Sequence, residues 1–251
     1  MHTIGVVMPA WNEAEGLPDF ISELNEELKK WKPIFVVIDD HSTDQTTLAV
    51  QRLIKSGIDL RLFVNQVNSG HGPSTLKALK AGLNLKVDFI VAVDGDGQCY
   101  GRDLARMVEI LATTQTDVVE GVRIARTDPA YRKFVTFMVR TLVSIKSRKV
   151  ALDANTPFRA YRVANLSDLV NVIPENIKIP NLLISMISRR WEFEISEVQI
   201  QSIPRRGSNP NGSTWGKTAK AIPSSRFIKF CISSGIQWVV YSVPSHPKPK
   251  K

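Results

Sequence analysis

The chain has 251 residues, of which 43% are hydrophobic and 23% are charged, and its formal net charge is +9 at pH 7. This length allows one large domain or two small ones, and the composition is ordinary for a soluble globular protein. Its two cysteines, Cys99 and Cys231, lie far apart and outside any metal-ligand spacing. They argue against a disulfide framework or a zinc site and favour a reducing, cytosolic compartment. No basic leader precedes the first apolar run, so no signal peptide is expected.

The positive charge is concentrated in two parts of the chain. Residues 198–251 contain nine Lys and Arg and no acidic residue, whereas residues 1–197 contain 24 of each sign. A second basic stretch, residues 120–162, has ten Lys and Arg against three acidic residues. Such bias indicates phosphate-rich substrates, anionic lipid or nucleic acid as partners. The last five residues, 247–251, are by themselves more typical of a solvated tail.

The first half of the sequence predicts alternating strands and helices. Strands are expected at Ile4–Met8, Ile34–Ile38, Leu60–Val64 and Phe89–Val93. Helices are expected at Glu15–Trp31, Asp44–Lys55, Ser74–Leu85 and Asp103–Ala112. Alternation of this kind is typical of βαβ units, so we expect an α/β protein with a mostly parallel central sheet flanked by helices.

The rhythm changes after about residue 120. The pattern predicts, in order, a strand at Val118–Val122, a basic helix at 130–149, a short extended segment at Phe158–Tyr161, a helix at Leu182–Arg190 and a half-buried strand at Phe193–Ile203. This half is expected to extend the same sheet and not to form an independent domain.

Two segments have the pattern of helices that lie in a membrane interface. Phe227–Val243 is about 17 residues long and contains Lys229 and Gln237, which is marginal for crossing ~30 Å of hydrocarbon. Its aromatic residues stand beside basic ones, which fits an interfacial helix better. Phe134–Ile145, interrupted by Arg140, is similar. Ordinary core helices are the alternative for both, and no spanning helix is expected.

The most informative stretch is residues 90–98, an apolar run that ends in Asp94 and Asp96 with Gly between and after them. Such a run predicts a strand buried on both faces, and open α/β sheets bind ligands at the carboxyl ends of their strands. Two like charges so close together are costly unless a cation or hydrogen-bond donors compensate them. A hard divalent ion that is also bound to phosphate would do so, and a solvated Asp-Gly turn is the alternative.

Polar clusters follow four of the predicted strands, at Pro9–Glu13, Asp39–Asp44, Asn68–Gly72 and Asp94–Gln98. In a parallel sheet these ends share one edge, so the clusters should face a single nucleotide-binding cleft. No glycine fingerprint of the dinucleotide type follows the first strand, and GxxxxGK[ST] does not occur. Neither a Rossmann dehydrogenase nor a P-loop ATPase is therefore favoured.

In combination, these motifs resemble the family 2 glycosyltransferases of the GT-A fold, and within them most closely the dolichol-phosphate mannose synthase and polyprenyl-phosphate glycosyltransferase group. Further similar motifs are Gly121–Arg123, Asp153–Arg159 and the stretch from Arg206 to Ser213. The resemblance covers roughly residues 3–215. Thr156-Pro157 in place of Ser-Gly, and His41 in place of the usual Gly, depart from the family pattern.

The resemblance implies a GT-A (nucleotide-diphospho-sugar transferase) fold and a single catalytic domain at residues 1–215. Residues 1–120 would form its nucleotide-sugar-binding half and residues 121–215 its acceptor-side half. Residues 216–251 would be a basic, amphipathic C-terminal extension.

The resemblance also implies roles for individual residues. The base and ribose of the sugar nucleotide would be lined by Pro9, Trp11, Glu13 and Asp40. Asp94 would lie against the nucleotide and the metal, with Asp96 and Gln98 as ligands of Mg²⁺ or Mn²⁺. Arg123, Arg159 and Arg206 would face phosphate groups of donor and acceptor. The expected catalytic residues are Asp96, Arg123, Asp153, Arg159 and Arg206.

The acceptor is indicated by a residue type that is missing. A sugar hydroxyl needs a general base, and family members that act on hydroxyls typically have a Glu-Asp pair at the start of a late helix. Ile179–Leu183, in the comparable place, has no carboxylate. A phosphate monoester needs no base, because its second pKa of ~6 makes it an anion already at pH 7.

We therefore expect an inverting, metal-dependent enzyme that moves a sugar from a GDP-mannose or UDP-hexose type of donor to a polyprenyl or dolichyl phosphate. It would be cytoplasmic and peripheral at the cytoplasmic face of the membrane, with no nucleic acid as partner, and a separate membrane-anchored protein could present the lipid.

Three alternatives remain open. The first is a family 2 transferase that acts on a saccharide hydroxyl in cell-surface polysaccharide synthesis, with Asp153 or Glu175 as base. The second is a sugar-1-phosphate nucleotidyltransferase, for which a Gly-rich loop with Arg or Lys would be expected where Pro9–Glu13 stands. The third is a non-catalytic protein that binds nucleic acid or lipid through its basic C-terminal region.

Overall fold

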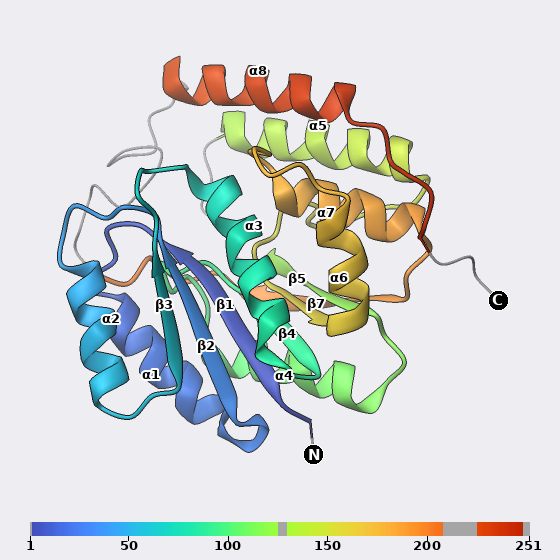
Figure 1. Ribbon diagram of the computed structural model, residues 1–251. Coiled ribbons are helices and arrows are strands. Elements are labelled where there is room, and N and C mark those ends of the chain that lie inside the picture. The colour runs from blue at the N-terminus through green and yellow to red at the C-terminus, as the bar shows by residue number, and fades with distance from the viewer. Residues whose placement is uncertain (1, 125–129, 208–224, 248–251) are drawn as a thin grey trace.

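The computed structural model describes residues 2–124, 130–207 and 225–247 (Figure 1). Within this part of the chain, seven strands form one sheet in the order β3-β2-β1-β4-β6-β5-β7. The strands are β1 (Ile4–Ala10), β2 (Pro33–Asp39), β3 (Leu60–Val64), β4 (Phe89–Ala92), β5 (Val118–Ile124), β6 (Arg159–Arg162) and β7 (Ile195–Gln201). All neighbouring strands are parallel except at β6, which is antiparallel to β4 and β5. The expected mostly parallel sheet is confirmed.

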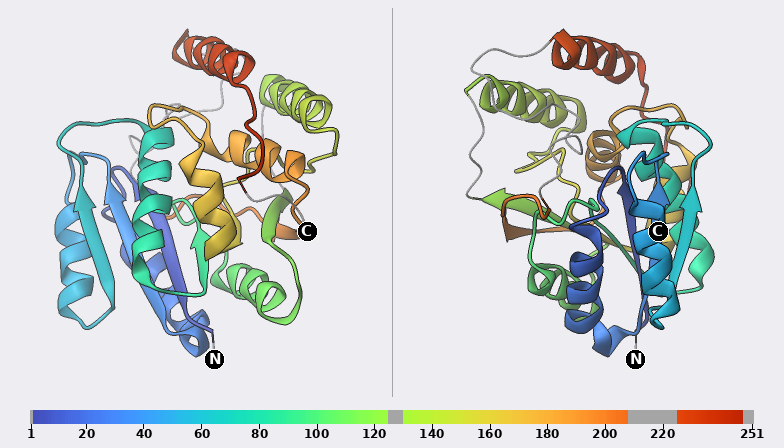
Figure 2. Two further views of the ribbon diagram at one scale, coloured as in Figure 1. Left: turned by 45° about the vertical axis from the view of Figure 1, so that its right-hand side comes forward. Right: turned by 90° about the vertical axis from the view of Figure 1, so that its left-hand side faces the viewer.

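Helices cover both faces of the sheet (Figure 2). They are α1 (Leu17–Glu27), α2 (Thr46–Lys55), α3 (His71–Gly82), α4 (Gly101–Thr113), α5 (Ala130–Ser147), α6 (Val163–Asn171), α7 (Pro180–Arg190) and α8 (Ser225–Val240), with 3₁₀ turns at Lys29–Trp31 and Leu83–Leu85. Helices α1, α2 and α4 pack on one face, and α3, α6 and α7 on the other. Helix α5 packs against α7, and α8 lies outermost (Figure 1).

The apolar runs form strands because both faces of the sheet are covered. In β1, Ile4, Val6 and Met8 contribute to one core layer and Val7 to the other. Such strands read as continuous apolar runs without alternation. Helix α1, in contrast, buries one stripe of apolar residues at helical spacing, which sets the spacing seen in its sequence.

Two features of the second half were not predicted. Helix α6 was not expected, because its nine residues are short of a full amphipathic pattern and only Leu166, Leu169 and Val170 are buried. The extended segment near Phe158 was expected, but its antiparallel direction was not. That direction depends on where the chain re-enters the sheet and not on the residues of β6 (Arg159–Arg162) themselves.

The two segments with an interfacial pattern both form helices. Phe134–Ile145 lies within α5, and Phe227–Val243 begins in α8 and runs past its end. In the described ranges, the structure has no helix whose length and hydropathy would let it cross a membrane. Part of the predicted Arg206–Ser213 motif, from residue 208 on, lies outside the described residues.

Candidate active site

The four predicted polar clusters meet at the carboxyl edge of the sheet. Three contacts connect them in chain order: Thr43 N to Asn12 Oδ1 (2.8 Å), Gly70 N to Asp40 Oδ2 (2.8 Å), and His71 Nε2 to Asp94 Oδ1 (3.6 Å). Segments that follow β1, β2, β3 and β4 are thereby held side by side. The sheet topology thus produces one site from four distant parts of the sequence.

Asp94 and Asp96 stand in the loop after β4, and their charges interact. Desolvation and the nearby charge of Asp94 raise the pKa of Asp96 to about 7, although Arg123 opposes the rise. The backbone N–H of Gln98 donates to Asp96 Oδ1 at 3.3 Å, and the Gln98 side chain is exposed. Two neighbouring carboxylates, of which Asp96 is desolvated, favour a bound cation.

The residues of this loop fit a divalent cation whose ligands come partly from the protein and partly from a bound substrate. Among the described residues, no three His, Cys, Asp or Glu side chains are grouped as a metal site. Asp94 and Asp96 would therefore need further oxygen ligands, from Gln98, water or phosphate. Mg²⁺ and Mn²⁺ are commonly held in this way, by one or two carboxylates together with substrate phosphates.

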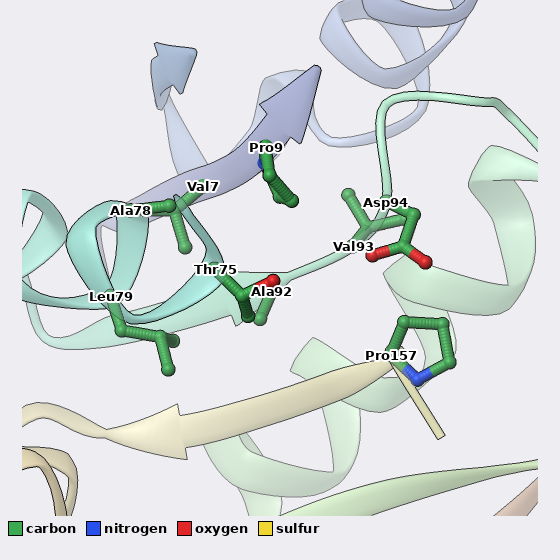
Figure 3. A pocket seen from close by; sticks show the side chains of 9 residues that line it. All are labelled: Val7, Pro9, Thr75, Ala78, Leu79, Ala92, Val93, Asp94 and Pro157. Atoms are coloured by element: carbon green, nitrogen blue, oxygen red, sulfur yellow. The ribbon is translucent and has the colours of Figure 1, made fainter. Parts of the chain in front are cut away.

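A small pocket lies beside Asp94 (Figure 3). Its walls include Val7 and Pro9 of β1, Thr75 of α3 and Pro157, which precedes β6. Pro157 belongs to the dipeptide that departs from the family pattern, and the structure places it at the polar edge. Strand β1, in the half expected to bind the sugar nucleotide, and the segment around residue 157, in the half expected to face the acceptor, therefore approach each other at Asp94.

Arg206 supports the Asp94–Gln98 loop from behind. Its guanidinium pairs with Glu23 Oε2 (2.6 Å) and donates to the carbonyl oxygens of Gly97 (3.1 Å) and Cys99 (3.2 Å). Its backbone N–H donates to the Asp96 carbonyl oxygen (3.1 Å). The sequence predicts that Arg206 faces a phosphate group. In the structure its side chain instead binds Glu23 and the carbonyl oxygens of the Asp94–Gln98 loop and of Cys99.

Asp40, expected at the base and ribose, is buried and shapes a neighbouring loop. Its carboxylate accepts from Asn65 Nδ2, Ser69 N and Gly70 N, each at 2.8 Å. These donors fix the turn that leads into α3. Asp40 thus acts on the site through the 65–70 loop in this structure.

The other residues expected at the nucleotide lie near the end of β1. Pro9 lies within β1, one residue before its end, and Trp11 directly after the strand is half-buried. Glu13 is buried, forms an ion pair with Arg205, and its backbone N–H donates to Thr46 Oγ1 at 2.8 Å. The segment that contains Arg205 therefore closes over this side of the site.

Arg123 and Asp153 form a bidentate ion pair. Arg123 Nε and Nη2 donate to the two carboxylate oxygens of Asp153 at 2.7 and 2.9 Å, and Nη2 also donates to the Asn155 carbonyl oxygen at 3.2 Å. A fork-to-carboxylate pair of this kind is strong and directional. It holds Arg123 at the edge of the site, within electrostatic range of Asp96.

Arg159 lies in the core and not at the site, which corrects its expected position facing phosphate. It is fully buried, forms an ion pair with Glu120, and donates to the carbonyl oxygens of Ala154 (3.0 Å) and Thr156 (3.2 Å). Glu120 also pairs with Arg189 at 2.8 Å. The cluster holds the segment 153–157 from below, so Arg159 positions Asp153 and Pro157 indirectly.

The sequence also contains signals for three residues that the motifs alone do not assign to the site. Glu120 is a charge inside an apolar strand run, which requires a buried partner, and Arg189 supplies one of its two. His71 belongs to the third polar cluster and lies against Asp94.

The start of α7 lies near the site and has no acid. A Cβ on Gly72 would come within 2.5 Å of the carbonyl oxygens of Ile177 and Lys178, so the approach to α7 packs on the first turn of α3. The first turn of α7 contains no acidic residue, as the sequence predicts. Glu175 is on the surface, paired with Lys80 at 2.9 Å.

Comparison with known proteins places these features in a family. The family described as "Glycosyl transferase family 2" matches residues 5–168. The undecaprenyl-phosphate 4-deoxy-4-formamido-L-arabinose transferase of Yersinia pestis (strain Pestoides F) is 25% identical over 199 residues, covering 78% of this chain and 60% of that protein. The uncharacterized protein MJ0544 of Methanocaldococcus jannaschii is 30% identical over 141 residues, covering 55% and 60%. The matched part of the chain spans about 60% of the length of these relatives.

The solved structures that resemble this one share its fold. Glucosyl-3-phosphoglycerate synthase from Mycobacterium tuberculosis in complex with Mn²⁺ and UDP-glucose has a TM-score of 0.60 at 20% identity, covering 84% of this chain and 73% of that one. The same enzyme with Mg²⁺ and UDP has a TM-score of 0.59, also at 20% identity, with the same coverage. The expected GT-A fold is thus confirmed. Since the family match extends from β1 into α6 and covers more than half of the sequence, the chain belongs to glycosyl transferase family 2.

Proposed function

We propose that this protein is an inverting, metal-dependent glycosyltransferase that moves a sugar from a nucleoside-diphosphate sugar to a polyprenyl phosphate. The observation that carries the proposal is the placement of Asp94 and Asp96 at the carboxyl edge of a family 2 sheet, where burial and the charge of Asp94 raise the pKa of Asp96. This is the position at which such a sheet binds a ligand, and the pair needs a cation with phosphate ligands.

On the donor side, Asp94, Asp96 and Gln98 would hold Mg²⁺ or Mn²⁺ together with the diphosphate. The metal would neutralise charge that develops on the leaving diphosphate. Pro9, Trp11 and the 65–70 loop held by Asp40 bound the space for the nucleoside. The proposal of a divalent metal and a sugar nucleotide is supported by the mycobacterial synthase, which was crystallised with Mn²⁺ and UDP-glucose.

On the acceptor side, the structure favours a nucleophile that needs no base. The first turn of α7 contains no carboxylate. Asp153 accepts two hydrogen bonds from Arg123, and Glu175 lies on the surface beside Lys80. Neither alternative base is free at the site, which counts against a saccharide hydroxyl as acceptor. A phosphate monoester is already an anion, and the Yersinia relative is named for its undecaprenyl phosphate.

We place the protein at the cytoplasmic face of the membrane as a peripheral protein, since its acceptor would be lipid-linked and its basic segments suit anionic headgroups. The test is a transfer assay with Mn²⁺ in which purified protein receives GDP-mannose or UDP-hexoses and either a polyprenyl phosphate or oligosaccharides. The proposal expects a lipid-linked sugar that EDTA abolishes. Glycosylated oligosaccharide without any lipid product would refute it.

A further inference from the structure

Helices α5 and α8 lie side by side and run in the same direction (Figures 1 and 2). Near their starts, the rings of Tyr131 and Phe227 meet edge to face with centroids 5.4 Å apart. Near their ends, Lys146 Nζ donates to the carbonyl oxygens of Trp238 (2.9 Å) and Tyr241 (2.8 Å). One side of helix α8 therefore packs against α5.

The outer sides of both helices expose large apolar side chains, which we call the α5/α8 face. Its members are Phe137, Met138, Leu142 and Ile145 on α5, and Ile228, Ile232, Ile236, Val239 and Val240 on α8. Exposure reaches 71% at Ile145 and 75% at Val240. Spacings of three, four and seven residues put these side chains on one side of each helix. Contiguous apolar patches of more than a few hundred Å² are rare on soluble monomers and mark interaction sites.

The charges around this face select its occupant. Neither helix contains an acidic residue, and exposed basic residues border the apolar side chains at Arg140, Arg148, Lys149 and Lys229. A second copy of this chain would bring like charges together. An anionic bilayer offers acyl chains for the apolar residues and headgroup phosphates for the basic ones.

The location of the face suits a lipid acceptor. Figure 1 shows α5 and α8 at the end of the molecule toward which β1 and β2 run, where the candidate active site also lies. Helix α5 has 18 residues, or roughly 27 Å, and both helices are amphipathic and follow the surface. They are therefore suited to lying in the membrane plane.

We propose that the α5/α8 face inserts into the interface of an anionic bilayer and thereby holds the active site at the level of the lipid phosphates. The proposal rests on the proposed function for its purpose, but its physical content is the binding of a membrane. The α5/α8 face would thus be the surface through which the protein reaches its lipid acceptor.

The test is binding of the full chain to vesicles of phosphatidylcholine with or without about a third of phosphatidylglycerol. The protein should bind the anionic vesicles, and its binding to the neutral vesicles should be at least about tenfold weaker. Ile232→Glu with Ile236→Glu on α8, or Phe137→Glu with Ile145→Glu on α5, should weaken binding at least about tenfold, since a charged side chain does not enter the acyl region. Ile54→Glu, at a site that is 39% exposed on α2, is the matched control and should bind like the wild type, because α2 packs on the opposite face of the sheet.

Two further measurements separate the outcomes. Melting temperatures of the variants should equal that of the wild type, because the replaced side chains are in solvent. Transfer to a short, water-soluble prenyl phosphate should be kept in the variants, while transfer to long-chain lipid in vesicles should fall about tenfold. Absence of vesicle binding, equal binding by all variants, or a dimer that only the face variants dissociate would overturn the proposal. Intact vesicle binding without any sugar transfer would instead refute the proposed function, and the proposed membrane-binding surface would still be supported.

Discussion

At the scale of single residues, Asp96 is the group whose chemistry is easiest to isolate. Its pKa is raised to about 7 by desolvation and by Asp94, so its charge is costly in the protein alone. Asp96→Asn keeps the shape and removes that charge. We expect transfer activity to fall about a hundredfold or more, or about 2.7 kcal/mol of transition-state stabilisation, because the proposed metal site would lose a charged ligand.

The same substitution should leave the fold intact. Since the carboxylate repels Asp94, the melting temperature of Asp96→Asn should be equal to or above that of the wild type. Asp88→Asn is the matched control, because Asp88 stands at the amino end of the same strand and accepts a hydrogen bond from Thr3 N at 2.7 Å. It should retain full activity. Wild-type activity in Asp96→Asn would remove the metal role assigned to this residue.

Glu120 is the residue on which the buried ion-pair cluster beside residues 153–157 depends. Burial by itself would raise its pKa, but the guanidinium groups of Arg159 and Arg189 hold the pKa below its ordinary value. Glu120→Gln leaves two buried cations without their carboxylate. We expect the free energy of unfolding at pH 7 to fall by about 3 kcal/mol, the lower end of the range for breaking a buried pair. Urea denaturation measures this loss.

The pH dependence of that stability has a definite sign. Because the folded pKa of Glu120 lies below the unfolded one, its contribution is complete above the unfolded value of about 4.3 and is lost as the pH falls through the folded value. The wild type should therefore lose stability below about pH 4.3, and Glu120→Gln should lose less over the same window. Glu175→Gln, at an exposed ion pair, is the control that should follow the wild type. Parallel curves for the Glu120 variant and the wild type would contradict this account.

At the scale of elements, the loop after β4 depends on one glycine. Gly97 has φ of +64°, and a Cβ there would lie 2.7 Å from Arg206 Cδ. Gly97→Ala should cost roughly 1–2 kcal/mol of stability for the left-handed backbone and should also displace Asp96 and Gln98. We expect a drop in activity of about tenfold or more, measured together with urea denaturation.

Gly57→Ala separates strain from site geometry. Gly57 has φ of +98°, a Cβ at this position would have no neighbour within 4 Å, and the residue lies in the turn after α2. This variant should lose similar stability through backbone strain and keep its activity. If both variants lost activity equally, the link between Gly97 and the site would be wrong.

The elements and the site differ in how far the sequence predicts them. Apolar runs that end in polar clusters predict β1 to β4 and their shared edge, because local pattern and topology agree there. The partner of an arginine side chain cannot be predicted from the residues next to it in the sequence. Arg206 pairs with Glu23 and Arg159 with Glu120, partners that are distant in the sequence and brought together only by packing. Both arginines, predicted to face phosphate, therefore pair with carboxylates of the protein instead.

At the scale of the whole molecule, the site joins both halves of one sheet. Asp94 follows β4, Pro157 precedes β6, and Arg206 comes after β7. A ligand that contacts these segments together stabilises the folded chain as a unit, because such contacts are lost on unfolding. Binding should therefore be visible in the global stability, even for a substrate that is not turned over.

Thermal denaturation with sugar nucleotides makes this measurable. At a ligand concentration of about a hundred times Kd, binding adds about 2.7 kcal/mol, which for a chain of this size corresponds to roughly 5–10 °C in melting temperature. We expect that shift with a GDP- or UDP-sugar in the presence of Mn²⁺, and its loss on addition of EDTA, since Asp94 and Asp96 repel a diphosphate that carries no cation. Asp88→Asn should keep the shift and Asp96→Asn should lose it. An equal shift without metal would mean that the diphosphate is held by cationic side chains alone, and the acidic pair would then have another role.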